Sequence, residues 1–400
     1  MIIIIYSQGL YHSPTFESLA LVTAQEILLW LHVDKVTPEL REHLGSEVEI
    51  RDIESSLQDL TEWLAIHPEL DSLLLSAPST YLSGATFALY SSIPESMATL
   101  GDSPILDMKA IKNPVEVAGM VEAHIRDAVA VCDWAAFMES QVQDQGAANW
   151  TEISAMELLS EFRLEQANSR GDSFGTISAY GANGAIIHYA PVSETDARLG
   201  QESLYMVDSG GQYLEGTTDI TRTFHYGLPT EDMVTRYTEV LAGAIDLASL
   251  VLPDKTQDSA VDLATRLPLF KKGLDYLHGT GHGIGAYGEV HEGPILVRMK
   301  NDKPGKFQTG VFFSDEPGYY QEGDWGLRLE QILMVVPAEF EDDTYGDFIR
   351  FEAVTLVPFE PKLVDFSLLR PEQIDWYNEY NSLIREKVGP RYGDNLGVMT

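Results

Sequence analysis

The segment Tyr205-Met206-Val207-Asp208-Ser209-Gly210-Gly211 decides the fold, because an apolar run ends directly in an acid. Such a run predicts a core strand, and a buried carboxylate without a partner is costly. Eleven residues after Asp208, Asp219 lies in Thr217-Thr218-Asp219-Ile220-Thr221-Arg222-Thr223. A hairpin turn near residues 214–216 would set Asp208 opposite Asp219. Two like charges side by side need a cation between them, and a metal ion is the natural candidate.

Two further acids follow the same pattern. The apolar run Val311 to Phe313 leads into Ser314-Asp315-Glu316-Pro317-Gly318, and Glu330 directly precedes the hydrophobic stretch 331–336. A solvated loop with two incidental acids would explain the first pair alone. It does not explain why acids recur where predicted core strands begin or end.

Histidines accompany these acidic strands. The run His278-Gly279-Thr280-Gly281-His282-Gly283-Ile284-Gly285 is a glycine-rich turn that lets two imidazoles approach a site closely. His291 follows in Val290-His291-Glu292-Gly293-Pro294, and His188 lies upstream in Ile186-Ile187-His188-Tyr189. Four of the ten histidines therefore flank the acidic segments.

Four carboxylates with one imidazole form an oxygen-rich set that can hold two divalent ions. Carboxylates can bridge two metals about 3.5–4 Å apart, and a bridging water becomes hydroxide near neutral pH. Such a pair hydrolyses amides or phosphoesters. A magnesium phosphatase would fit the acids, but the sequence contains nothing that would cradle a phosphate.

Composition narrows the class of protein. The 26 Lys and Arg against 62 Asp and Glu give a net charge of −36, which disfavours binding to nucleic acid and to membrane surfaces. Cys132 is the only cysteine, so neither an intrachain disulfide nor a Cys-ligated metal cluster is expected. No apolar run reaches the roughly 18 residues of a membrane helix, and residues 1–6 predict a buried strand rather than a signal peptide. We therefore expect a soluble, acidic, cytoplasmic protein.

The pattern along the chain predicts two domains, with a boundary near residue 108. Residues 1–107 read as a small α/β domain with strands at 19–22, 27–31 and 73–75 and a helix at 57–67. Asn113 can cap a helix that has Pro114 in its first turn. Residues 108–400 read as α+β, with helices at 114–142, 151–167, 231–251, 257–266 and from Pro371, and β-rich segments at 174–227, 307–336 and 350–358.

The acids and histidine resemble a known family. The residues match, in order, neighbours and spacing, the dinuclear metal motif of the pita-bread metallopeptidases: Asp208, Asp219, His282, Glu316 and Glu330. The runs 186–192, 278–285, 290–294 and 315–320 look like the eukaryotic cytosolic type of aminopeptidase P, the Xaa-Pro aminopeptidases. The similarity covers roughly residues 108–390, and more weakly the segment before. It implies a pita-bread (creatinase/aminopeptidase) catalytic domain after a small, incomplete creatinase-N-like α/β domain.

The resemblance also implies metal roles. Asp208 would chelate one ion, Asp219 and Glu330 would bridge both, and His282 and Glu316 would bind the other. The cofactor would be two Mn²⁺ per chain, with Zn²⁺ or Co²⁺ as alternatives. The ions would polarise the scissile carbonyl and activate the bridging water, with Glu316 taking its proton.

By the same resemblance, His188 and His291 would bind the substrate and stabilise the oxyanion. His278 would line the pocket for a proline ring, and Arg328 would orient Glu330 from outside the metal's ligands. The reaction would remove the N-terminal residue from peptides with proline at the second position. A proline amide nitrogen carries no hydrogen, so aminopeptidases that need a donor there cannot act.

Several alternatives remain open. Related enzymes carry two similar α/β domains before the catalytic one, and here the first is missing and the second starts partway in. That loss would weaken substrate positioning more than metal chemistry, and would favour a catalytically weakened pita-bread binding module. Prolidase, which cleaves X-Pro dipeptides, is the nearest alternative enzyme. A metal-free creatinase-like hydrolase is disfavoured, because four clustered carboxylates would repel one another. A homodimer is the family expectation.

Overall fold

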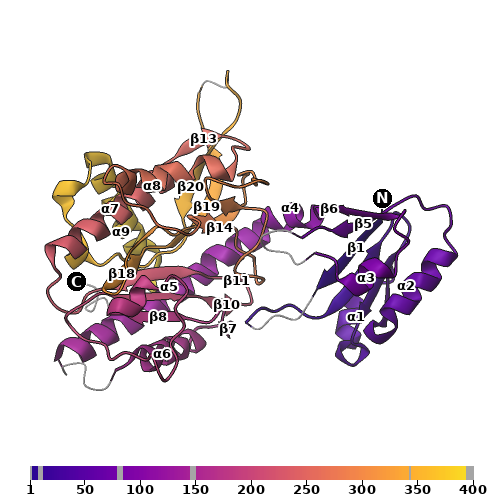
Figure 1. The fold of residues 1–400 in the computed structure, drawn as a ribbon, viewed down its shortest axis with the longest axis horizontal. Coiled ribbons are helices and arrows are strands. Elements are labelled where there is room, and N and C mark those ends of the chain that lie inside the picture. The colour runs from indigo at the N-terminus through magenta and orange to yellow at the C-terminus, as the bar shows by residue number, and fades with distance from the viewer. Residues whose placement is uncertain (1, 8–11, 79–83, 145–149, 342–343, 393–400) are drawn as a thin grey trace. The chain divides into compact units, whose positions relative to one another are not determined.

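The computed structural model describes residues 2–7, 12–78, 84–144, 150–341 and 344–392 (Figure 1). The chain forms two compact units, Met1–Lys109 and Ala110–Thr400. The second unit carries every residue that the sequence proposes for the site.

The smaller unit is built on one six-stranded sheet with the order β4-β3-β2-β1-β5-β6. Strand β2 pairs antiparallel with β1 and β3, whereas β3–β4, β1–β5 and β5–β6 are parallel pairs. The three strands expected from the sequence are confirmed as β2, β3 and β5; the predicted burial of residues 1–6 falls on side chains outside the described part. The strand bounds are β1 Ile2–Ser7, β2 Ser18–Val22, β3 Ile27–Leu31, β4 Val48–Asp52, β5 Leu73–Ser76 and β6 Ala98–Gly101.

Helices complete the core of this unit. The expected helix at 57–67 is α2 (Ser56–Ala65), which buries Leu60, Trp63 and Leu64 in a cluster with the apolar side chains of β2, β3 and β5. Helix α1 and strand β4 were not predicted, because each is too short to show a full hydrophobic period. The other helices here are α1 Pro38–Leu44, α3 Phe87–Ser91 and α4 Pro104–Ala110, the last reaching the division between the units.

The larger unit begins with a long helix, α5 (Pro114–Asp144). The Asn113 side chain accepts hydrogen bonds from the amides of Val115 (2.9 Å) and Glu116 (3.0 Å), so the predicted cap is confirmed. The helices that follow are α6 Glu152–Leu164, α7 Glu231–Ala248, α8 Asp262–Phe270 and α9 Pro371–Lys387. Helix α7 packs on α8 and α9, and α6 packs on α5 (Figure 1).

The helix predicted at 257–266 is displaced along the chain. Asp258–Ala260 forms a single 3-10 turn, and α8 starts only at Asp262. The Asp258 carboxylate accepts the amide hydrogens of Leu296 (2.8 Å) and Gly305 (2.9 Å), which lie far away in sequence. This tertiary role competes with helix formation and moves the start of the helix.

The described strands of the larger unit form five sheets of two to four strands. Their orders are β12-β9-β8, β11-β10-β7, β13-β20-β19-β16, β14-β15 and β17-β18. The bounds are β7 Ser169–Asp172, β8 Ile177–Tyr180, β9 Tyr205–Ser209, β10 Gly211–Tyr213, β11 Gly216–Thr217, β12 Ile220–Phe224, β13 Val251–Pro253, β14 Gly281–His282, β15 Leu296–Val297, β16 Phe312–Asp315, β17 Gly318–Gln321, β18 Trp325–Arg328, β19 Gln331–Ala338 and β20 Phe348–Ala353.

The hairpin expected between the first two acids is present, but its register is not the predicted one. Asp208 in β9 pairs with Thr221 in β12, not with Asp219. Strands β10 and β11 form a smaller hairpin that turns at residues 214–215, with Gly216 paired to Tyr213. Asp219 therefore lies in the link between β11 and β12 rather than within a strand.

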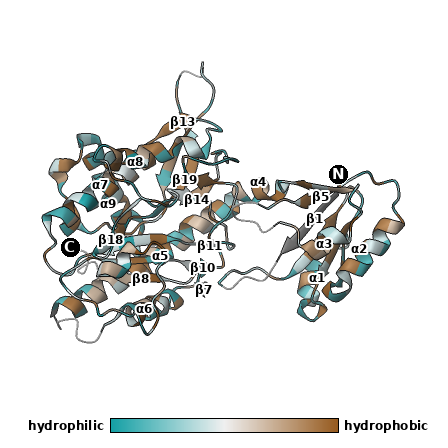
Figure 2. Ribbon diagram, viewed as in Figure 1, coloured by the Kyte–Doolittle hydropathy of each residue, from teal (hydrophilic) through white to brown (hydrophobic). Residues whose placement is uncertain are grey.

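Apolar side chains from both helices and strands form the core of this unit. Trp134 of α5, Tyr205 of β9 and Leu241 of α7 belong to its largest cluster of buried residues. Figure 2 shows both brown and teal residues along these helices, as expected where one face packs inward and the other meets water. Within the described ranges, no helix combines the length and apolarity that crossing a membrane requires.

Candidate metal centre

The centre of the site is a buried group of two acids and one histidine. Asp219, His282 and Glu330 each offer a ligand atom, and these atoms lie within 4.8 Å of one another. The His282 Nε2 atom is 3.3 Å from Asp219 Oδ2 and 3.7 Å from Glu316 Oε1. Three of the four proposed acidic ligands, Asp219, Glu316 and Glu330, thus lie around the imidazole of His282.

Strand ends position these side chains. Asp208 lies in β9, His282 ends β14, Glu316 follows β16, and Glu330 lies between β18 and β19. Backbone hydrogen bonds fix the two glutamates: the amide of Glu330 donates to the Thr221 carbonyl (3.0 Å), and that of Glu316 to the Thr280 carbonyl (2.8 Å). Both glutamates are therefore fixed by backbone hydrogen bonds to neighbouring segments.

Gly281, in the glycine-rich turn, allows the close backbone approach that the composition of the turn predicts. A Cβ atom on Gly281 would collide with the backbone carbonyl of Ser314 in β16. The Ser314 hydroxyl in turn accepts the amide hydrogen of His282 at 3.0 Å. Close approach of two backbones therefore places His282 beside Glu316.

Arg328 brings the fourth acid, Asp208, into the group. Its Nη2 atom lies 2.5 Å from Asp208 Oδ2, and both side chains are largely buried. The sequence suggested that Arg328 orients Glu330, and the contact with Glu330 is indirect: Arg328 Nε donates to the Thr221 hydroxyl (3.3 Å), which donates to Glu330 Oε2 (2.7 Å). Arg328 therefore pairs with Asp208 and reaches Glu330 through Thr221.

The electrostatics of this cluster favour a cation. Burial first, and then the neighbouring acids, raise the pKa of Asp219 and of Glu330 well above the ordinary range. Burial also raises the pKa of Glu316, although His282 opposes that shift. Among the described residues, the buried Asp219 Oδ1 has no hydrogen-bond partner. Clustered acids with an unsatisfied oxygen fit hard divalent ions, which would satisfy these atoms and offset their repulsion.

His278 is held in one protonation state by its neighbours. Arg328 Nη1 donates to the Tyr320 hydroxyl (2.8 Å), so the tyrosine directs its own proton to His278 Nε2 (2.8 Å). His278 Nδ1 then donates to the Gly279 carbonyl at 2.7 Å. Burial lowers the pKa of His278 to about 3. The ring is neutral with both nitrogens engaged, so only its faces and edges remain for a ligand.

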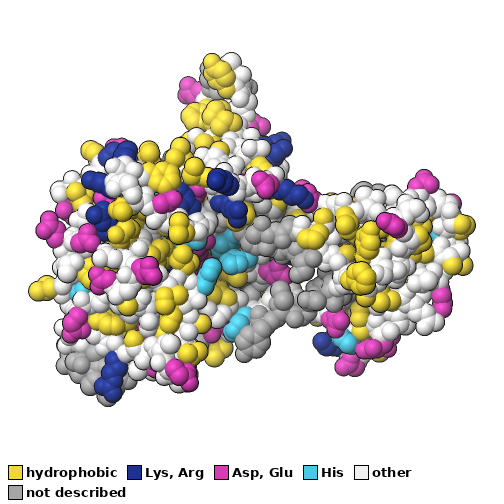
Figure 3. Space-filling view, viewed as in Figure 1, with side chains coloured by type: hydrophobic (Ala, Val, Ile, Leu, Met, Phe, Trp, Pro, Cys, Tyr) yellow, Lys and Arg dark blue, Asp and Glu magenta, His cyan; other side chains and the backbone are white. Residues whose placement is uncertain are grey.

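The two other histidines lie beside this group. The His291 ring packs edge-to-face on His282, with centroids 4.1 Å apart, and the charge of His282 is the main cause that lowers the pKa of His291 to about 3. His188 contributes, as the last of the causes, to the lowered pKa of His278 and of His291. Figure 3 shows histidine side chains gathered on one face of the larger unit.

Several supporting residues escaped the sequence analysis. Thr221 links Arg328 to Glu330, and Tyr320 links Arg328 to His278. The buried Arg222 donates to the carbonyl oxygen of Glu330 at 2.6 Å and stacks over the Phe359 ring. Thr221 and Arg222 lie two and three residues after Asp219, so their proximity to an acid was a usable signal. Tyr320 offered none, because its partners lie in other segments.

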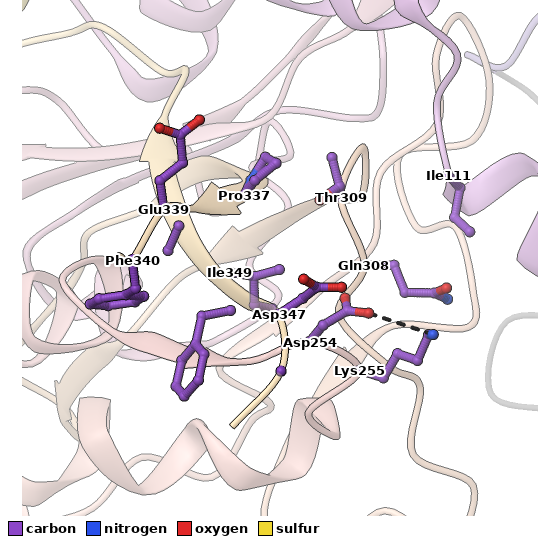
Figure 4. A pocket seen from close by; sticks show the side chains of 13 residues that line it. Ile111, Asp254, Lys255, Gln308, Thr309, Pro337, Glu339, Phe340, Asp347 and Ile349 are labelled. Atoms are coloured by element: carbon purple, nitrogen blue, oxygen red, sulfur yellow. Dashed lines mark ion pairs between the residues drawn. The ribbon is translucent and has the colours of Figure 1, made fainter. Parts of the chain in front are cut away.

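A separate hollow of about 760 Å³ lies at the base of the β19–β20 hairpin (Figure 4). Its lining includes the ion pair of Lys255 with Asp254 (3.6 Å), together with Phe340 and Ile349. None of the site residues expected from the sequence lines it. The chemistry of the metal cluster therefore lies elsewhere in the unit.

Comparisons with known families agree with this geometry. The sequence profile of metallopeptidase family M24 matches residues 118–337, and that of the C-terminal region of peptidase M24 matches 347–396. The creatinase/prolidase N-terminal domain matches residues 8–116. The expected fold class, a pita-bread domain preceded by a creatinase-N-like domain, is confirmed.

Individual relatives carry related names. The chain is 36% identical to "Aminopeptidase P1" of Lotus japonicus, covering 96% of this chain and 66% of the relative. It is 38% identical to "Xaa-Pro aminopeptidase 1" of Dictyostelium discoideum (94% and 59%) and to "Xaa-Pro aminopeptidase 2" of Mus musculus (96% and 56%). The chain thus spans between 56% and 66% of the length of these relatives.

Two solved structures extend the comparison. The X-prolyl aminopeptidase of Caenorhabditis elegans, described as a cytosolic enzyme with a di-nuclear active site, matches with a TM-score of 0.89 and 30% identity, covering 98% of this chain and 65% of its own. The Xaa-Pro dipeptidase of Bacillus anthracis matches with a TM-score of 0.68 and 21% identity, covering 90% and 94%. The second likeness concerns the fold alone.

Proposed function

This chain belongs to metallopeptidase family M24, and from that premise we propose that it is an Xaa-Pro aminopeptidase, which removes the N-terminal residue from peptides with proline at the second position. One observation carries the proposal: Asp219, His282 and Glu330 converge in a buried cluster that Glu316 and Asp208 adjoin. The names of the relatives support the choice of substrate.

The cofactor that we propose is a pair of Mn²⁺ ions. The ions would be held by Asp208, Asp219, His282, Glu316 and Glu330. This oxygen-rich set also admits Zn²⁺ or Co²⁺. When bound, such ions supply Lewis-acid activation of a carbonyl and of water. The unsatisfied Asp219 Oδ1 and the mutual repulsion of the acids support this assignment.

Glu316 is the proposed acceptor of the proton from the attacking water. Its side chain is 19% exposed, against 4% for Asp219, so it is the more accessible of the two to water and substrate. Burial raises its pKa, which brings a carboxylate closer to the range suited to proton transfer near neutral pH. The same group can then return the proton to the leaving nitrogen.

The histidines around the cluster would bind the peptide. His291, kept neutral beside His282, can donate a hydrogen bond to the substrate without competing for the metals. His188 would also contact the peptide. His278 has no free nitrogen, so it would pack its ring against the substrate's proline.

Prolidase is the second candidate function. The chain covers 94% of the Bacillus anthracis Xaa-Pro dipeptidase but 65% of the nematode aminopeptidase. The dipeptidase shares the fold, whereas the sequence identity is higher to the aminopeptidase, at 30% against 21%. A third alternative, from a different class, is a pita-bread module that binds peptide without turnover.

Three further assignments belong to this proposal. The catalytic domain would comprise residues 108–400, and residues 1–107 would form the creatinase-N-like domain. The protein would act in the cytoplasm, as the nematode structure's description as a cytosolic enzyme suggests. It would assemble as a homodimer, which sedimentation analysis at micromolar concentration would test.

The test is an assay of the purified chain with Mn²⁺ on three peptides: X-Pro-Pro, the dipeptide X-Pro, and Met-Ala-Ser. Release of X from the tripeptide, lost on chelation, is the expected result. Cleavage of the dipeptide alone would establish prolidase instead. Two bound metals without cleavage of any peptide would contradict the proposed enzyme and favour the binding module.

A further inference from the structure

Glu152 is a buried carboxylate outside the metal cluster. Glu152 is the first residue of α6 and is fully buried. Its side chain faces the chain segment 180–197, which contains His188 and, apart from the 3-10 turn Gly181–Ala185, no further helix. A buried acid at this place requires an explanation, because burying a charge is expensive unless it is well bonded.

The carboxylate of Glu152 is bonded by neutral donors on both oxygens. Oε1 accepts from the backbone amide of Tyr180 (2.6 Å) and from the side-chain amide of Asn183 (3.0 Å). Oε2 accepts from the Tyr189 hydroxyl (2.8 Å), the backbone amide of Ala197 (2.9 Å) and again from Asn183 (3.1 Å). The position of Glu152 in the first turn of a helix further favours its negative charge.

These donors are spread over the whole segment 180–197. Tyr180 ends β8, Asn183 lies in the 3-10 turn, Tyr189 directly follows His188, and Ala197 closes the segment. The backbone of Glu152 adds a second tie, because its amide donates to the Ala197 carbonyl at 3.0 Å. One side chain therefore fixes the segment at four points.

His188 depends on this arrangement. Its side chain is exposed, whereas the next residue, Tyr189, is 6% exposed. The Tyr189 hydroxyl lies within hydrogen-bond distance of Glu152 Oε2 (2.8 Å) and of the Thr195 hydroxyl (3.0 Å), so it ties the segment both to Glu152 and to itself. A turn, in which the Tyr189 amide donates to the Ile186 carbonyl at 3.0 Å, separates the buried anchor from the exposed histidine. Without the anchor, a segment with so little secondary structure would sample many conformations.

We propose that Glu152 is a positioning residue, which holds His188 at the site by binding Tyr189 and the ends of segment 180–197. The inference rests on the proposed function only through the role of His188 in peptide binding. Glu152 touches neither the metal ligands nor the substrate in this account. It acts through the segment that it ties together.

The mildest test is Tyr189→Phe, which removes one hydroxyl and keeps the ring. The matched control is Tyr180→Phe, because the Tyr180 hydroxyl bonds Glu202 at 3.2 Å while its backbone amide still bonds Glu152. Hydrogen exchange of the amides in 186–197 should become about tenfold faster in Tyr189→Phe and stay unchanged in Tyr180→Phe. Equal exchange in both variants would overturn the proposal, whether or not the wild-type chain cleaves any peptide.

A double-mutant cycle then separates positioning from general weakening. Tyr189→Phe should lower kcat/KM for X-Pro-Pro about five- to tenfold in the wild-type background and less than twofold in His188→Gln. If His188→Gln turns over too slowly, the Kd of the tripeptide replaces kcat/KM. An equal loss in both backgrounds would refute the role through His188. Failure of wild type to cleave X-Pro peptides would instead refute the proposed function, and hydrogen exchange would still decide the inference.

Discussion

Glu152 and the acids of the metal cluster are both buried in the larger unit, but they differ in how their oxygens are hydrogen-bonded. Glu152 receives hydrogen bonds from Tyr180, Asn183, Tyr189 and Ala197, and both of its oxygens are bonded. In the metal cluster, by contrast, Asp219 has an oxygen without a partner in the described structure, and burial, followed by the neighbouring acids, raises its pKa.

This difference in hydrogen bonding distinguishes an acid that stabilises the fold from acids that bind a ligand. A closed shell of donors stabilises the chain fold itself, so Glu152 needs no ion. Asp208 and Glu330 accept hydrogen bonds from Arg328 and Thr221, but one oxygen of Asp219 stays unsatisfied among the described residues. The crowding of these acids destabilises the fold until a cation joins them. Burial alone would not distinguish the two sets, because both are buried.

The largest effect is expected for Glu316→Gln. The amide can still approach a cation but cannot take a proton, so kcat for X-Pro-Pro should fall about 10²–10⁴-fold with little change in Tm. Steady-state kinetics with matched metal content would measure it. Glu322→Gln, on the exposed turn after β17, is the control. Full activity of Glu316→Gln would remove Glu316 from the role of base.

Glu152→Gln should disrupt the hydrogen bonds that the Glu152 carboxylate accepts. The new amide group would face donors where an acceptor is needed, so the metal-free protein should lose about 3 kcal/mol of stability. Thermal unfolding would measure this loss, with Glu157→Gln on the exposed face of α6 as the control. A change as small as that of the control would mean that the bonds to Glu152 contribute little.

Removal of a carboxylate from the metal cluster should instead stabilise the metal-free protein. Asp219→Asn removes a charge that its acidic neighbours oppose, so the metal-free protein should gain about 1–2 kcal/mol. Because the folded pKa of Asp219 is raised, the acid costs stability as pH rises above about 4, and the gain should grow in that direction. Thermal unfolding at several pH values would check this. A variant less stable than wild type without metal would contradict the comparison.

The smallest effect concerns selectivity. His278→Ala should lower kcat/KM for X-Pro-Pro about tenfold, because the proline ring loses its packing partner, and should affect residual X-Ala cleavage less. Parallel assays on the two peptide series would measure the ratio. An equal loss on both would count against a pocket for proline.

The sequence predicted the metal cluster because its signal is local. Asp208, Glu316 and Glu330 adjoin apolar runs, and His278 and His282 lie among glycines. The resemblance of these motifs to a known family then implied the full ligand set. The register of the β9–β12 hairpin could not be obtained in this way. The inner hairpin at 211–217 takes up residues between the two acids, and the pairing of Asp208 with Thr221 depends on that inner turn.

The supporting residues show where such prediction ends. Glu152 looks like an ordinary acid in the first turn of a helix, and its partners lie 28 to 45 residues away without a period. The same holds for Tyr320, which bonds His278 across 42 residues. Contacts of this kind follow from tertiary packing, which no hydrophobic pattern in one segment encodes.

The most direct test of the central claim is to count the ions. Metal-free protein would be loaded with Mn²⁺ and freed of excess ion, and its metal content would be measured by elemental analysis beside that of Asp219→Asn. We expect two ions per wild-type chain and at most one in the variant. A wild-type chain that retains no ion, or a variant that still holds two, would contradict the assignment of these acids as a dinuclear metal centre.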